Sequence, residues 1–226
     1  MPLDPNELVT YLAHLKAHNT KAWFDANREQ YQHLRTQFVD VVQDVIFGIA
    51  RFDNHIHIDM KPEDTLFRIN RDVRFSKDKS PYKTTFSAAI STHGRRASMP
   101  MYYFHITESG ELFAAGGLYM PEPDKLLAVR NHVVNRPDAL STLLNNKPFI
   151  KMFGGIEDEA ALKRVPKGFD EDAPHADYLK LKSWTVARSS PIKKDATVDK
   201  DVQPFVLGMF EAMYPLIAWL RGAVGI

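Results

Sequence analysis

The chain has 226 residues, 44% hydrophobic and 25% charged, which is typical of a folded protein rather than a disordered one. A formal net charge of +1 excludes a protein that coats polyanions over its whole surface, so any basic surface must be local. The absence of cysteine excludes disulfides, thiolate nucleophiles and cysteine-ligated metal sites. No signal-peptide pattern opens the sequence, and we expect a cytoplasmic protein without a membrane partner.

The first 50 residues predict two helices. Asp4 is an N-cap candidate, because proline follows it and an acid stands three residues on. A second start at Asn19 or Thr20 leads into apolar residues spaced three and four apart as far as Ile49. That spacing predicts one long amphipathic helix after the second start.

Beyond Asp53 the apolar period changes to two, which is typical of half-buried strands. Strands are expected at 55–59, 67–75, 86–90, 102–106 and 111–118, with a turn at 108–110 and a mobile connection at 93–100. Consecutive strands without intervening helices predict an antiparallel meander.

The carboxy-terminal half returns to helical patterns. Helices are expected at 124–134 and 137–144, then irregular chain over 149–173, a strand at 182–188 and a buried apolar helix that includes 205–220. The sequence therefore predicts a single α+β domain over residues 1–226, with an antiparallel meander sheet packed against several helices.

Residues Arg68 to Lys83 are the most informative stretch, because they hold six of the 29 Lys and Arg and only two acids. Such clustering is self-repulsive unless an internal acid or a bound anion relieves it. In an extended segment, Arg68, Asn70, Asp72 and Arg74 share one face. Arg71 interrupts the apolar side and needs a partner acid, for which Asp25 or Asp59 is a candidate.

This pattern predicts a cradle for phosphate or carboxylate, since guanidinium groups bind planar anions through two hydrogen bonds. The predicted ligand-binding residues are Arg68, Asn70, Arg71, Arg74, Lys77, Lys79, Tyr82, Lys83, Gly116 and Gly117. Other interpretations stay open: cross-strand ion pairs on a solvated face, core packing of the tyrosine, and a bulge at the glycine pair.

Two residues are candidates for catalysis, Asp72 and His105. Asp72 lies among cations that lower its pKa, which suits an orienting group or a base better than a general acid. His105 could act as a general base if it faces the basic cluster, although a satisfied sheet histidine is the simpler interpretation.

No metal is predicted, and the sequence leaves the cofactor unknown. His55, His57 and Asp59 would share one strand face and could ligate zinc, but an amphipathic strand exposes the same side chains for no special reason. Lys167 and Gly168, with Lys163 and Arg164, would form a second basic wall or simply a solvated surface.

The segment from Arg68 to Lys83 resembles the signature segment of the domain of unknown function 2461 family. Further agreement, in order, comes from Trp23-Phe24 with Asn27, Tyr102-Tyr103, Gly116-Gly117-Leu118-Tyr119 before Pro121, Arg130 and Pro166-Lys167-Gly168. The resemblance covers nearly the whole chain. It implies kinship but supplies no activity, cofactor or catalytic residue.

Three hypotheses for function remain. The first is a pocket for a small anionic ligand, in an enzyme or a binding domain. The second is a nucleic-acid-binding module that uses the same basic strip, against which the near-neutral net charge counts. The third is an interaction protein in which the strip is a structural ion-pair network. We favour the first.

Overall fold

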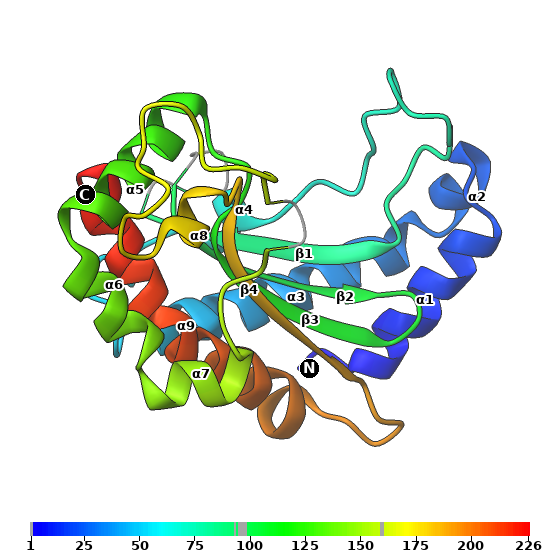
Figure 1. Ribbon diagram of the computed structural model, residues 1–226. Coiled ribbons are helices and arrows are strands. Elements are labelled where there is room, and N and C mark those ends of the chain that lie inside the picture. Colours follow the sequence, from blue (N-terminus) through cyan, green and yellow to red (C-terminus); the bar gives the residue numbers. More distant parts are fainter. Residues whose placement is uncertain (1, 93, 95–98, 159–160) are drawn as a thin grey trace.

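The computed structural model describes residues 2–92, 94, 99–158 and 161–226. Its centre is a sheet of four strands, β1 (Thr85–Ile90), β2 (Met101–Thr107), β3 (Glu111–Leu118) and β4 (Trp184–Pro191). Neighbours in chain order pair antiparallel throughout, so the predicted meander and the α+β class are confirmed. Helices α1 and α3 lie behind the sheet and α9 lies beneath it (Figure 1).

The amino-terminal helices are α1 (Pro5–Ala17), α2 (Lys21–Ala26) and α3 (Arg28–Ile49). The Asp4 carboxylate accepts a 2.8 Å hydrogen bond from the Asn6 amide, as expected of an N-cap. The single long helix predicted after the second start is wrong, because the chain breaks at Asn27. There the backbone leaves helical geometry, and the Asn27 side chain donates to the Trp23 carbonyl at 2.8 Å.

Shorter helices connect and flank the strands. They are α4 (Pro62–Thr65), α5 (Pro123–Asn135), α6 (Pro137–Leu144), α7 (Lys147–Phe153), α8 (Ala176–Leu179) and the π-helical turn η1 (Val198–Val202), which leads into the terminal α9 (Gln203–Val224). The irregular chain expected from 149 therefore begins only after α7. Within the described part of the chain, no helix combines the length and apolarity that a bilayer crossing requires.

The strand predicted at 55–59 is wrong, since this segment forms turns. Ile56 is 2% exposed and Ile58 is 65% exposed, whereas both would share one face of a strand. Asp53 shapes the turn by accepting the His55 amide at 3.1 Å. Most of the connection expected at 93–100 lies outside the described residues.

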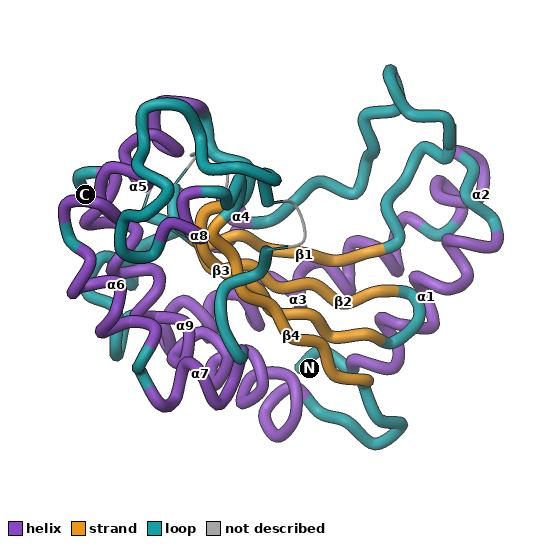
Figure 2. The backbone as a smooth tube through the Cα atoms, in the orientation of Figure 1, coloured by secondary structure: helices purple, strands orange, loops and turns teal. Residues whose placement is uncertain are grey.

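One face of the sheet packs on the helices. Phe38 of α3 lies against Phe86 and Phe104, with ring centroids 5.4 and 5.6 Å apart. Phe210 of α9 lies 5.1 Å from Tyr102 on the same face. Along the middle of the opposite face no described helix packs (Figure 2). Alternate residues of β2 there are half-buried, whereas Ser87 and Ala89 of β1 are buried.

A buried polar cluster joins the turn at Asp53 to the last helix. Asp53 accepts hydrogen bonds from the Tyr102 hydroxyl at 2.8 Å and from Nη1 of Arg221 at 2.7 Å. Both ion-pair partners are almost fully buried, and within the described residues Nε and Nη2 of Arg221 have no hydrogen-bond partner. The cluster fixes the end of α9 against the turn that follows α3.

Candidate functional site

The segment predicted as a cationic strand is instead a closed loop. We call residues 68–83 the basic loop. Asn70 forms an isolated antiparallel bridge with Tyr82, the Arg71 amide donates to the Pro81 carbonyl at 2.9 Å, and the Lys83 amide donates to Ile69 at 2.8 Å. Between these contacts the chain is irregular and projects beyond α2 (Figure 1). The strand expected at 67–75 is therefore wrong.

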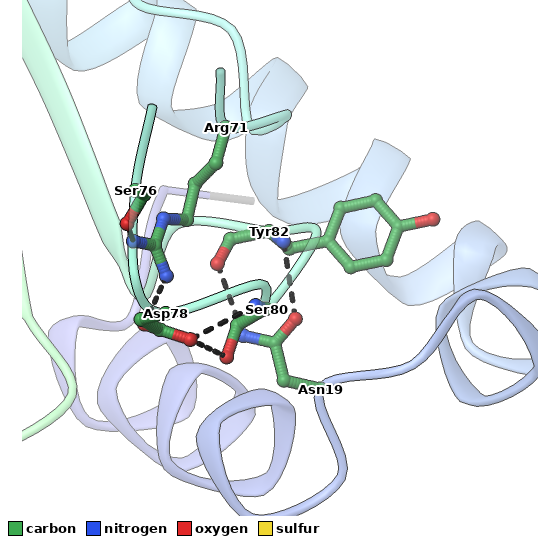
Figure 3. Close-up of polar contacts among 6 residues, drawn as sticks. All are labelled: Asn19, Arg71, Ser76, Asp78, Ser80 and Tyr82. Atoms are coloured by element: carbon green, nitrogen blue, oxygen red, sulfur yellow. Dashed lines mark hydrogen bonds and ion pairs between the residues drawn. The ribbon is translucent and has the colours of Figure 1, made fainter. Parts of the chain in front are cut away.

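Within the basic loop, Asp78 neutralises Arg71. The two form an ion pair, and Arg71 also donates to the Ser76 hydroxyl at 3.3 Å (Figure 3). Asp78 further accepts from the Ser80 amide and hydroxyl at 2.9 and 2.6 Å, and these bonds together with Arg71 hold its pKa well below the usual range. The acid partners considered for Arg71, Asp25 and Asp59, were wrong; Asp25 pairs with Lys21 and Arg28.

Asp72 neutralises Arg74. The guanidinium donates from Nε and Nη2 to the two carboxylate oxygens of Asp72 at 2.9 and 2.6 Å, and these hydrogen bonds lower the pKa of Asp72. The carboxylate is thus held ionised. The two arginines are bound within the loop and do not converge on a common recess.

The remaining cations of the basic loop differ in their contacts. In the described part of the chain, no ion pair forms at Arg68 or Lys77, and Lys79 donates to the Val73 carbonyl at 3.0 Å. Phe75, which lies between Arg68 and Lys77 in the sequence, is 94% exposed. The Arg74 guanidinium lies 5.8 Å from the Phe75 ring centroid. The loop therefore presents one bare ring among several cations.

Tyr82 is 6% exposed, and we assign it to the core. Its ring stacks on Phe24 with centroids 4.1 Å apart, while the Asn19 side chain bonds both backbone polar groups of Tyr82 at 3.0 and 3.1 Å (Figure 3). These contacts anchor the basic loop to α2 and turn the ring away from any ligand outside.

The uncovered face of the sheet carries a cluster of rings, which we call the open face cluster. His105 of β2 stacks on Phe113 of β3 with centroids 4.8 Å apart, and Nδ1 of His105 lies 3.1 Å from the Tyr103 hydroxyl. Phe67, at the edge beside β1, meets Tyr103 edge-on at 6.0 Å. The Lys83 amine lies over Phe67, 5.0 Å from its centroid. A continuous chain of contacts thus leads from the basic loop to His105.

Small side chains surround this cluster. The strand register places two rows across the face: Ser87, His105, Phe113 and Ser189 in one, and Ala89, Tyr103, Ala115 and Ala187 in the next. Because these neighbouring side chains are short, they leave the rings accessible to another flat group.

Burial sets the protonation of the open face cluster. Partial burial lowers the pKa of His105 and outweighs the opposing effect of Glu111. Burial likewise raises the pKa of Tyr103, against a hydrogen bond with Ser87 that lowers it. At neutral pH the imidazole is uncharged and the phenol keeps its proton, so both can donate or accept one hydrogen bond.

Each end of the open face borders a hollow. Near the basic loop, at the edge of β1 where the covered and open faces meet, a niche of about 10 Å³ has room for about one water. It is lined by Tyr31, Arg35 and Phe38 of α3 together with Phe67, Thr85, Phe86 and Ser87. At the far end, Thr185 bonds Glu157 at 2.8 Å beside a cavity of about 140 Å³.

The predicted glycines lie at this far end, away from the basic loop. A Cβ on Gly117, whose φ is +124°, would meet the Trp184 carbonyl at 1.9 Å, and one on Gly116 would meet Met213 at 2.2 Å. Close approach of β4 and α9 accounts for both glycines. The structure does not bring them together with the loop cations.

A larger cavity of about 590 Å³ lies outside the open face, along the chain from 163 to 180. Lys163 and Arg164 line it, but so do Glu171, Asp172 and Asp177, so its charge is mixed rather than basic. As for metals, His55 and His57 lie in turns rather than on a strand, and among the described residues no three His, Asp or Glu side chains group as ligands.

Of the predicted residues, the structure brings Lys83 and His105 into one chain of contacts and leaves the other loop residues outside it. Phe67, Ser87, Tyr103 and Phe113 were not among the predicted ligand-binding residues. The available signal was the half-buried side of β2 and β3, where rings stand at alternate positions among small residues.

The chain matches the family described as conserved hypothetical protein (DUF2461) over residues 7–219, and it belongs to that family. No curated protein matches the sequence. No solved structure matches it either.

Proposed function

We propose that this member of the DUF2461 family binds a small anionic compound that also carries a planar ring, such as a nucleotide, on the open face of the sheet. The observation that supports the proposal is the chain of contacts from the Lys83 amine, over Phe67 and Tyr103, to the stacked pair of His105 and Phe113. The anion site then lies at the edge of β1 rather than between Arg71 and Arg74.

The planar part of the ligand would lie on the stacked pair. His105 and Phe113 are nearly parallel, at 16°, so their arrangement suits a third flat group beside them. Ala115 of β3 and Ala187 of β4, which are short and only half-buried, leave room around it. Since Nδ1 of His105 faces Tyr103, Nε2 is the ring nitrogen that would contact a polar atom of the ligand.

The charged part of the ligand would lie toward Phe67. Lys83 brings its ammonium group over one side of that ring, and Arg35 lines the niche that Phe67 shares with Ser87. Ammonium and guanidinium groups near a hydroxyl are a common set of phosphate contacts. No reaction follows from this arrangement, and the proposal is one of binding.

Titration with adenosine 5′-monophosphate, followed by calorimetry, tests the proposal. Adenosine carries the ring without the charge, and ribose 5-phosphate carries the charge without the ring. The nucleotide should bind more tightly than either. Phe113→Leu should weaken nucleotide binding roughly 5- to 150-fold, the range for loss of one base–aromatic stack.

Lys83→Gln should weaken binding of the nucleotide but leave the weaker binding of adenosine unchanged. Phe47→Leu, at a partly exposed phenylalanine of α3, and Lys147→Gln on α7 are the matched controls and should change neither. Equal affinity of the wild type and Phe113→Leu, or no binding of the nucleotide at millimolar concentration, contradicts the proposal.

A further inference from the structure

The tip of the basic loop has a feature that the open face does not use. Phe75 is 94% exposed, against 70% for Tyr119 and 69% for Met120, the next most exposed large apolar side chains among the described residues. The loop that carries it projects away from the sheet (Figure 1). A benzyl group held in water gains free energy when another surface covers it.

Charged groups order the surroundings of Phe75. Asp72 holds the Arg74 guanidinium by two hydrogen bonds, and that guanidinium lies 5.8 Å from the Phe75 ring centroid, within cation–π range. The pair thus forms a preorganised guanidinium and ring at the tip. Lys77 and Lys79 follow within four residues and add positive charge that the two loop acids do not cancel.

We propose that the basic loop binds single-stranded nucleic acid, with one base stacked on Phe75 beside Arg74 and the backbone phosphates at Arg68, Lys77 and Lys79. Aromatic side chains combined with cations are the usual means of holding single strands without sequence preference. This site is separate from the open face cluster, and the inference does not depend on ligand binding there.

A duplex fits this loop less well than a single strand. Paired bases already stack on one another, so their faces are closed to a side chain unless the helix is kinked. The described loop also has no helix or two-stranded ribbon that could enter a major groove. An unpaired base offers its face without such cost.

An anionic membrane also fits less well. The tip offers one benzyl group, whose burial is worth less than a myristoyl chain, and even that chain anchors a protein only marginally. Arg74 and Ser76, on either side of Phe75, are polar, so the apolar surface does not extend along the chain.

Fluorescence anisotropy with a labelled oligothymidylate of about 15 nucleotides tests the inference on the full chain. At about 50 mM salt the wild type should bind with an affinity better than about 100 µM. Phe75→Ala should weaken binding roughly 5- to 150-fold. Tyr119→Ala removes a matched exposed ring outside the basic loop and should leave oligonucleotide binding unchanged. Both variants should keep the melting temperature of the wild type.

Heparin separates stacking from charge, because it is a polyanion without bases. Phe75→Ala should change heparin binding less than about 2-fold. Lys77→Gln with Lys79→Gln should weaken binding to both polymers and reduce the salt slope for the oligonucleotide by about 1.4. The control pair Lys193→Gln with Lys194→Gln, two exposed lysines outside the loop, should leave the slope unchanged.

Three results would overturn the inference. The first is no oligonucleotide binding by the wild type at low salt. The second is equal binding by wild type and Phe75→Ala. The third is Phe75-dependent binding to phosphatidylserine vesicles without binding to the oligonucleotide, which would assign the tip to a membrane surface.

Discussion

Arg221 with Asp53 and Arg74 with Asp72 are two arginine–aspartate pairs at opposite extremes of exposure. The side chains of the first pair are 2% and 0% exposed, and those of the second are 77% and 45% exposed. The contacts are similar, with ion-pair distances of 2.7 and 2.6 Å. Surroundings decide what each pair does, because water screens the exposed charges and leaves the buried ones dependent on each other.

The comparison separates stability from recognition. The buried pair joins the turn after α3 to the end of α9, and removal of one partner leaves a charge without compensation. The exposed pair joins two residues of the same loop, so it contributes little to the fold. Its hydrogen bonds hold the Arg74 guanidinium beside the exposed ring of Phe75.

The largest effect is expected at the buried pair. Arg221→Met should lower the free energy of unfolding by about 3–5 kcal/mol, because Asp53 then keeps a buried charge whose remaining hydrogen-bond donors, among the described residues, are the Tyr102 hydroxyl and the His55 amide. Denaturant unfolding measures it.

The double variant Asp53→Asn with Arg221→Met tests the cause. Asparagine removes the charge and can still accept from Tyr102, so the double variant should be more stable than the sum of the single losses predicts, by about 0.5–3 kcal/mol. Additive losses would mean that the two groups act independently, and the comparison with the exposed pair would fail.

An acid titration should show a smaller effect of the same pair. Burial raises the pKa of Asp53, but hydrogen bonds from Arg221 and Tyr102 outweigh it and the net pKa is lowered. A group with a lowered folded-state pKa stabilises the protein above its unfolded value, near 3.9, and loses that contribution as pH falls through the folded value. The stability gap between the wild type and Asp53→Asn should therefore be constant from neutral pH to about 5 and narrow below about 4.

A gap that stays constant down to about pH 2 would show that Asp53 does not titrate in this range.

Local pattern predicted the elements that depend on local burial. The alternation in β2 and the spacing in α3 both report which side chains face the core, and both appear in the structure. The same alternation misled at Ile56 and Ile58, where turns rather than a strand place one residue inside and the other outside. The spacing of apolar residues indicates which side chains are buried, but it does not by itself determine the backbone conformation.

Contacts between residues far apart in the sequence could not be predicted from local sequence patterns. Asp53 and Arg221 stand 168 positions apart, and neither is marked by its neighbours in the sequence. In the basic loop the sequence indicated charge correctly, but it could not show that Asp72 and Asp78 would neutralise two of the arginines. The open face cluster depends on the contact of Phe67 with Tyr103, which only the folded chain brings about.

The smallest effect on stability, and the sharpest test of the comparison, is expected at Asp72. Asp72→Asn should shift the melting temperature by less than about 2 °C, since the pair is exposed.

The effect of Asp72→Asn on nucleic-acid binding depends on whether the charge of Asp72 or its hydrogen bonds to Arg74 affect binding. If Asp72 only repels phosphates, the variant gains a net positive charge and binds both oligothymidylate and heparin more tightly. If Asp72 orients Arg74 against Phe75, oligothymidylate binding weakens while heparin binding strengthens, and we expect this divergence. A parallel gain for both polymers would show that the exposed pair has no role in recognition beyond its charge.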